Sequence, residues 1–137
     1  MAVEIAIRHK GDFRCEAELE GKAATIDTDA PSENGGRGEL MSPTDLVGAA
    51  LGTCVVTMVV TAAKRAGAEV GEVTAQVSKE MVSEPKRRIG ALHMTVKVPN
   101  WPNLSDEVRK RLEAAATGCP VKNSLHPDTK LTISFEY

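Results

Sequence analysis

The feature that most constrains the fold is the stretch 46–63, eighteen residues without a charged side chain. Its length lies at the lower edge of what a membrane-spanning helix needs. The stretch also contains two glycines, three threonines and four alanines, so it is only weakly hydrophobic. A helix that is apolar all round is equally typical of a protein core. We therefore predict a buried central helix rather than a membrane segment.

The residues before and after this stretch contain start and stop signals for a helix. Ser42 can cap the first turn, Pro43 suits the first helical position, and Asp45 lies where a capping box requires an acidic side chain. The helix should end near Arg65, before Gly67. Its middle is rich in valine and threonine, which have low helix propensity, so only extensive tertiary burial would hold it helical.

Alternating apolar and polar residues predict strands on both sides of this helix. The expected strands cover residues 3–7, 13–19, 23–27, 73–78, 92–98 and 131–137, and a second helix covers 105–117. The glycine-rich segment 28–41 is typical of a loop. This order of elements predicts an α+β fold with a largely antiparallel sheet. At 137 residues, the chain should form one domain over 1–137.

Composition excludes several functional classes. Seventeen basic and nineteen acidic residues produce no strong field for nucleic acid or an anionic membrane, and only four aromatic residues are available to stack on bases. We find no CxxC, HExxH or phosphate-binding glycine motif, and therefore expect no metal and no cofactor. The N-terminus lacks a signal-peptide pattern, which favours the cytoplasm.

Three cysteines, an odd number at wide spacings, are a poor framework for secreted disulfides. Cys54 lies mid-helix among apolar residues, so it should be inert unless the fold brings a cation to it; Arg14 and Arg37 are the candidates. Cys119 precedes Pro120 at the start of a helical turn, where free backbone N–H groups favour it as the more acidic thiol. Cys15, in a predicted strand, is interpreted as structural.

Two segments resemble the OsmC/Ohr family. They are Ser42-Pro-Thr-Asp-Leu-Val-Gly-Ala-Ala-Leu-Gly-Thr-Cys54 and Gly118-Cys-Pro-Val-Lys-Asn-Ser-Leu125. The resemblance implies an OsmC-like fold in an intertwined homodimer, with the helix that carries Cys54 packed between sheets and active sites at the subunit interface. It also implies a peroxidase in which Cys54 is oxidised by an organic hydroperoxide to a sulfenic acid and Cys119 resolves it as a disulfide. A dithiol, a lipoyl group in the organic-hydroperoxide branch, would then reduce the pair.

That branch uses an arginine, held by a glutamate ten residues before the reactive cysteine, to activate the thiolate. This sequence has Thr44 at that position, and its nearest carboxylate is Asp45. Arg14 matches the arginine best, and Arg37 is the alternative. This difference at position 44 predicts that the protein belongs to an OsmC-like branch distinct from typical Ohr proteins, with weaker or differently tuned peroxidase activity. The competing hypothesis is a non-catalytic protein that binds a small hydrophobic or thiol ligand at the dimer interface.

Overall fold

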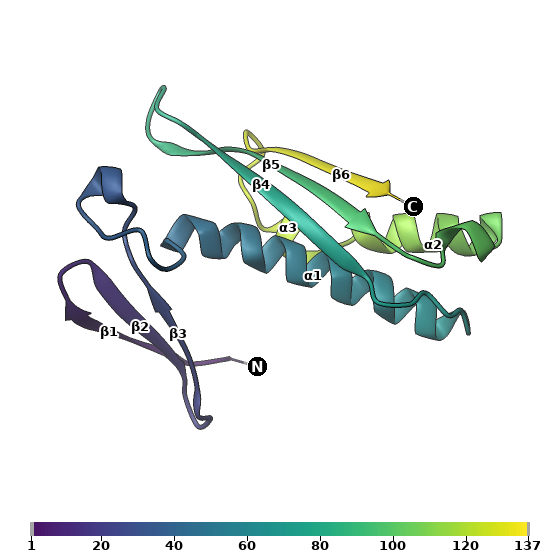
Figure 1. Cartoon of the computed structure of the whole chain (residues 1–137), viewed down its shortest axis with the longest axis horizontal. Coiled ribbons are helices and arrows are strands. Elements are labelled where there is room, and N and C mark those ends of the chain that lie inside the picture. The colour runs from purple at the N-terminus through teal and green to yellow at the C-terminus, as the bar shows by residue number, and fades with distance from the viewer. Residues whose placement is uncertain (1, 137) are drawn as a thin grey trace. The chain divides into compact units, whose positions relative to one another are not determined.

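The computed structural model describes residues 2–136, and the chain divides into two compact units, Met1–Val47 and Gly48–Tyr137. The order of strands and long helices agrees with the sequence prediction, so the α+β class is confirmed (Figure 1). The prediction of a single domain stays a prediction. The elements are β1 (Ile5–Gly11), β2 (Arg14–Leu19), β3 (Ala24–Thr28), η1 (Ser32–Asn34), α1 (Pro43–Arg65), β4 (Thr74–Val82), β5 (Arg88–Lys97), η2 (Trp101–Asn103), α2 (Asp106–Thr117), α3 (Pro120–Asn123) and β6 (Lys130–Glu136).

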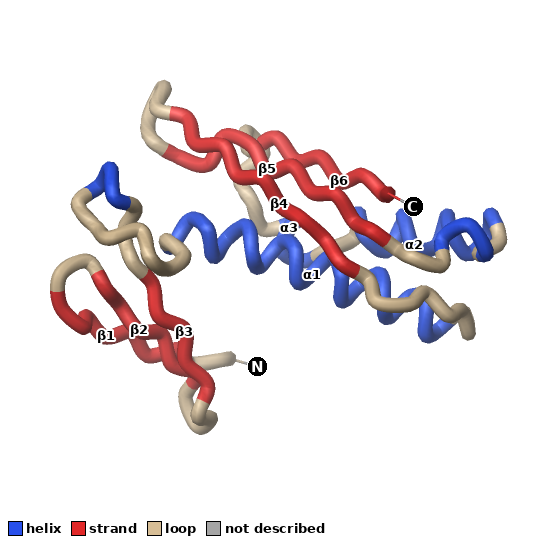
Figure 2. The backbone as a smooth tube through the Cα atoms, in the orientation of Figure 1, coloured by secondary structure: helices blue, strands red, loops and turns tan. Residues whose placement is uncertain are grey.

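The N-terminal unit contains an antiparallel sheet in the order β1-β2-β3 (Figure 2). Ile7, Ala17 and Ile26 are directly paired across the three strands, so they share one face. The adjacent ladder of Arg8, Glu16 and Asp27 forms a polar opposite face. The apolar face is open within the single chain, where Ile7 is 67% and Ile26 is 54% exposed.

The start of α1 is fixed by the predicted capping box. The backbone N–H of Asp45 donates to Ser42 Oγ at 3.1 Å, and the backbone N–H of Ser42 donates to Asp45 Oδ2 at 2.9 Å. The two bonds satisfy N–H groups that the first helical turn would otherwise leave unpaired. The sequence therefore predicted this helix boundary correctly.

The C-terminal unit contains the second sheet, in the order β4-β5-β6. β4 and β5 form a long antiparallel hairpin, whereas β5 and β6 run parallel. Parallel neighbours need a crossover connection, and the segment that contains η2, α2 and α3 supplies it. The alternation of apolar and polar residues predicted the strands, but it did not predict that β6 runs parallel to β5. Of the last predicted strand, residue 137 lies outside the described residues.

One stripe of α1 packs on the sheet of the C-terminal unit. Gly48 and Gly52 face this sheet at close range, because a Cβ atom at Gly52 would lie 3.1 Å from Val77 Cγ2 and one at Gly48 would lie 3.7 Å from Leu92 Cδ2. The buried stripe consists of Gly48, Leu51, Gly52, Val55, Val59 and Ala63. Small residues at this contact let the β-branched helix approach closely.

The remaining surface of α1 is half-buried or exposed in the single chain, including the exposed Thr53 and Thr57. By length and composition alone, α1 is apolar enough to cross a membrane, a test that the core helix of a soluble protein also passes. The packed stripe on β4 and β5 is what a core helix requires. We therefore keep the interpretation of α1 as a core helix.

Candidate functional site

The C-terminal unit brings Cys54 and Cys119 together, although they are far apart in sequence. Cys54 lies in the middle of α1 and is half-buried, and Cys119 lies between α2 and α3 and is fully buried. α2 ends before Cys119 because the N–H of Gly118 closes its last turn, and Pro120 starts the next helix. The two side chains interact through a hydrogen bond, and both cysteines are free thiols.

The environment of Cys119 overturns the expectation of an acidic thiol at this position. Burial raises the pKa of the Cys119 thiol above its ordinary value, and the hydrogen bond with Cys54 adds to the effect. The backbone N–H groups of Lys122 and Val121 favour the thiolate, as predicted from the helical turn, but their effect is smaller than that of burial. Cys119, which lies beside Cys54, is therefore a weaker acid than an ordinary cysteine.

The raised pKa of Cys119 predicts a fall in stability at alkaline pH. Above the ordinary cysteine value of 9.0, the unfolded chain releases this proton while the folded chain retains it. The folded state then binds more protons, so the free energy of unfolding decreases as the pH rises. We expect the reduced protein to lose stability between pH 8 and pH 10 in urea titrations, and Cys119→Ala to show a shallower decrease. If the free energy of unfolding fell equally steeply with pH in both proteins, the loss of stability would not come from Cys119.

The two candidate arginines both lie in the N-terminal unit but differ in how they are held. Arg14 Nη2 donates to Glu39 Oε2 at 2.6 Å and lies 3.7 Å from Asp29 Oδ2. Within residues 2–136, the Arg37 guanidinium makes only a loose ion pair at 3.8 Å with the exposed Asp12, and the Arg37 side chain is 65% exposed. Arg14 is therefore the better fixed of the two.

The carboxylates around Arg14 were missed in the sequence analysis, which considered only Asp45 for this role. Asp45 serves as the capping-box residue of α1, and Thr44 Oγ1 lies 3.2 Å from Ser42 Oγ. Asp29 and Glu39 lie near the two ends of the glycine-rich segment 28–41, and nothing in its sequence pattern predicts that these ends meet at Arg14. The N–H of Asp29 donates to the Met41 carbonyl, so the segment returns to the end of β3.

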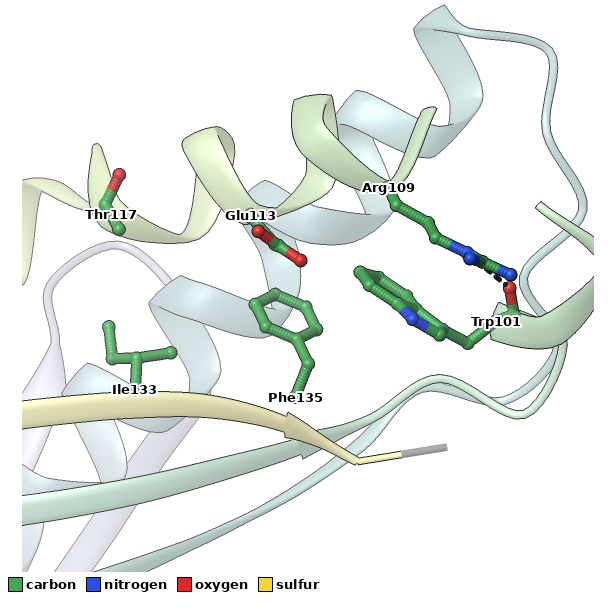
Figure 3. Close-up of a pocket in the computed structure, with 6 residues that line it drawn as sticks. All are labelled: Trp101, Arg109, Glu113, Thr117, Ile133 and Phe135. Carbon is green, nitrogen blue, oxygen red and sulfur yellow. Dashed lines mark hydrogen bonds between the residues drawn. The ribbon is translucent and has the colours of Figure 1, made fainter. Parts of the chain in front are cut away.

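A separate open pocket of about 510 Å³ lies between α2 and β6 in the C-terminal unit. Trp101 stacks on Phe135 with ring centroids 5.0 Å apart, and the Arg109 guanidinium lies 5.9 Å from the Trp101 ring centroid. Figure 3 shows these side chains at the pocket. Arg109 also donates to the Trp101 carbonyl. None of the predicted site residues lines this pocket. It is not the site of the cysteine chemistry.

Among residues 2–136, no group of three or more histidine, cysteine, aspartate or glutamate side chains is arranged to hold a metal ion. The chemistry available to the described residues is that of the thiol pair and of the arginine held by carboxylates. The interacting thiols are typical of a site that reacts through a thiolate.

The fold and the thiol pair define a class: a small α+β protein with two interacting free cysteines, one in the long helix and one at the turn after the second helix. The family described as OsmC-like protein matches residues 36–134, and this chain belongs to that family.

Solved structures support this assignment. A protein described as an osmotic stress induced and detoxification response protein, from Psychrobacter arcticus, is 32% identical, with a TM-score of 0.88 over 96% of this chain and 94% of that one. The organic hydroperoxide resistance protein OsmC of Legionella pneumophila shares the fold at 19% identity and a TM-score of 0.75, covering 100% and 98% of the two chains. OhrB of Bacillus subtilis, an organic hydroperoxide resistance protein, shares the fold at 17% identity and a TM-score of 0.67, covering 99% of this chain and 98% of that one. No curated protein matches the sequence.

Proposed function

We propose that this protein is a cysteine-based peroxidase that reduces organic hydroperoxides. The observation that carries the proposal is the hydrogen-bonded pair of free thiols, Cys54 and Cys119, in a chain of the OsmC-like family. Two thiols in contact can be oxidised to a disulfide by one peroxide molecule, with no metal or cofactor. Relatives named organic hydroperoxide resistance proteins support the same substrate class.

In the proposed reaction, the Cys54 thiolate attacks one oxygen of the hydroperoxide O–O bond. An S–O bond forms as the O–O bond breaks, the organic oxygen leaves as an alcohol after taking up a proton, and Cys54 becomes a sulfenic acid. Cys119 then attacks the sulfenic sulfur, and a disulfide forms with release of water. A dithiol such as a lipoyl group reduces this disulfide by exchange and is itself oxidised to a disulfide.

The raised pKa of Cys119 suits the resolving role that we propose for it. A buried thiol with a raised pKa is a poor first nucleophile, because the thiolate is the reactive form. Its hydrogen bond to Cys54 keeps it next to the sulfur that it must attack. Cys54, which is half-buried rather than enclosed, is the thiol that a hydroperoxide can reach.

We propose Arg14 rather than Arg37 as the cation that activates Cys54. Arg14 is held by two carboxylates, so its guanidinium has a defined position, whereas the Arg37 side chain is mostly in solvent. A fixed cation stabilises a thiolate more effectively than a mobile one because less ordering is needed at the moment of reaction.

We further propose that the protein functions as a homodimer in the cytoplasm. The sheet of the N-terminal unit leaves Ile5, Ile7 and Ile26 between 54% and 67% exposed on one apolar face. A contiguous apolar face of this kind marks an interaction surface, and a second copy of the chain is the partner that we propose for it. Size-exclusion chromatography with light scattering should give twice the mass of the 14.6 kDa chain.

The proposal is tested by adding one equivalent of cumene hydroperoxide to the reduced protein, then counting thiols and mapping disulfides by mass spectrometry. We expect a rapid Cys54–Cys119 disulfide while Cys15 stays reduced. The Cys54→Ser variant should form no such disulfide. If both thiols stay free in the folded wild-type protein, the catalytic proposal fails and the alternative, a protein that only binds a hydrophobic or thiol ligand, takes its place.

A further inference from the structure

The pocket between α2 and β6 has one apolar wall and one polar wall. β6 contributes the half-buried Ile133 and Phe135, which lie on one face of the strand because they are two residues apart, and Trp101 extends this wall. α2 contributes three polar side chains that share a helix face at a spacing of four residues, namely Arg109, Glu113 and Thr117. Small-molecule sites have volumes of about 300–1,000 Å³, so a pocket of about 510 Å³ is large enough for a small ligand.

The cation of the polar wall is engaged by the turn that precedes α2. Arg109 Nε donates to the Trp101 carbonyl at 3.0 Å, and Nη2 donates to the Pro102 carbonyl at 3.0 Å. Nη1 lies 3.5 Å from Asp106 Oδ1. All three guanidinium nitrogens therefore have an acceptor outside the space that the pocket encloses, and Arg109 is held at the Trp101 end of the pocket.

The carboxylate of the polar wall, Glu113, has no such partner. Arg109 precedes it by four residues, a spacing at which opposite charges on a helix can pair, but the Arg109 nitrogens are turned to other acceptors. Lys110, three residues before Glu113, does not pair with it either. Among residues 2–136, the Glu113 carboxylate forms no hydrogen bond and no ion pair. The pocket thus contains one anionic group that no protein cation contacts.

Glu113 lies opposite an aromatic side chain. In Figure 3, Glu113 points from α2 toward β6, and the Phe135 ring points from β6 toward α2. A positive group placed between them is attracted by the carboxylate, and the ring can add a cation–π interaction. Hydrocarbon attached to that positive group would cover the apolar surface of Phe135 and Ile133, which water otherwise contacts.

We propose that this pocket binds a small organic cation, in which an ammonium group is attached to a short hydrocarbon body. The ammonium group pairs with Glu113, and the body packs on Phe135 and Ile133. An anion fits less well, because Arg109, the cation among the lining residues, already has three acceptors. This binding site is separate from the proposed peroxidase chemistry, since neither Cys54 nor Cys119 lines the pocket.

The test uses Trp101, the single tryptophan of the protein, whose fluorescence reports on events in this pocket. The reduced protein is titrated at pH 7 and constant ionic strength with hexylamine, hexanol and hexanoate, which share a six-carbon chain and differ in charge. We expect a saturable change in Trp101 emission, with hexylamine bound about fivefold more tightly than hexanol, as one exposed ion pair allows. Hexanoate should bind most weakly. Saturation-transfer NMR provides a second measure of the same affinities.

Two variants identify the group that selects the cation. Glu113→Gln should lower the affinity for hexylamine about fivefold, to that of hexanol, and should leave the affinity for hexanol unchanged. Glu113 is exposed, so this variant should fold normally, which thermal unfolding checks. Glu107→Gln is the matched control, because Glu107 is an exposed carboxylate of the same helix that does not line the pocket. It should bind hexylamine as the wild-type protein does.

Three results would overturn the inference. If the three probes bind with equal affinity, the pocket does not select a cation. If Glu107→Gln weakens hexylamine binding as much as Glu113→Gln does, the general charge of α2 attracts the probe and Glu113 has no special role. If no probe binds by fluorescence or NMR, the pocket does not take this ligand, and in a protein that light scattering shows to be a dimer a second copy of the chain would be its occupant.

Discussion

Replacing Cys54 by serine is expected to lower the rate of hydroperoxide reduction by about a thousandfold or more, as loss of a nucleophile does in enzymes that react through one. A serine hydroxyl ionises far too weakly to attack the O–O bond. The change is nearly isosteric and the site is half-buried, so folding should be retained. The measurement is the consumption of cumene hydroperoxide in the presence of dihydrolipoamide, with circular dichroism to confirm the fold.

The Cys119→Ser variant separates the two thiol roles. We expect one rapid turnover, trapping of a Cys54 sulfenic acid by dimedone, and slow cycling thereafter, because no second thiol is in contact to form the disulfide. Cys15→Ser is the matched control, since Cys15 lies in β2 and should not affect the reaction. Full activity in Cys54→Ser, or trapping of the sulfenic acid on Cys119, would reverse the assignment.

Replacing Leu92 by alanine is expected to lower the free energy of unfolding by about 3 kcal/mol, the typical cost of a cavity in a packed core. Leu92 is 0% exposed, and its Cδ2 lies close to Gly48, at the contact between β5 and α1. Loss of this side chain removes packing from the helix that carries Cys54. Urea unfolding at a fixed protein concentration measures the effect, since association also contributes to stability.

The control for this prediction is Met81→Ala in the neighbouring strand β4. Met81 is 36% exposed, so its truncation should change the free energy of unfolding by about 0.5 kcal/mol or less. Similar losses for the two variants would mean that Leu92 is not at the centre of the core. They would also mean that the contact between α1 and the sheet contributes little to stability.

Local sequence signals predicted the secondary structure well, because the responsible interactions span only a few residues. The capping box of Ser42 and Asp45 placed the start of α1, and the second helix was predicted to begin at Ser105, which the structure shows to be its N-cap. Alternation gave the strands to within a few residues, although β4 and β5 extend further toward their hairpin than the pattern indicated. Two short 3-10 helices, at Ser32–Asn34 and Trp101–Asn103, were missed.

By itself, then, the sequence determined the order of helices and strands and the family, since these depend on residue type and spacing along the chain. Tertiary structure decided the parallel pairing of β5 with β6 and the raised pKa of Cys119, where burial outweighs the nearby N–H groups. It also decided which carboxylates hold Arg14. Burial and contacts between distant residues are set by the folded chain as a whole, and no local pattern encodes them.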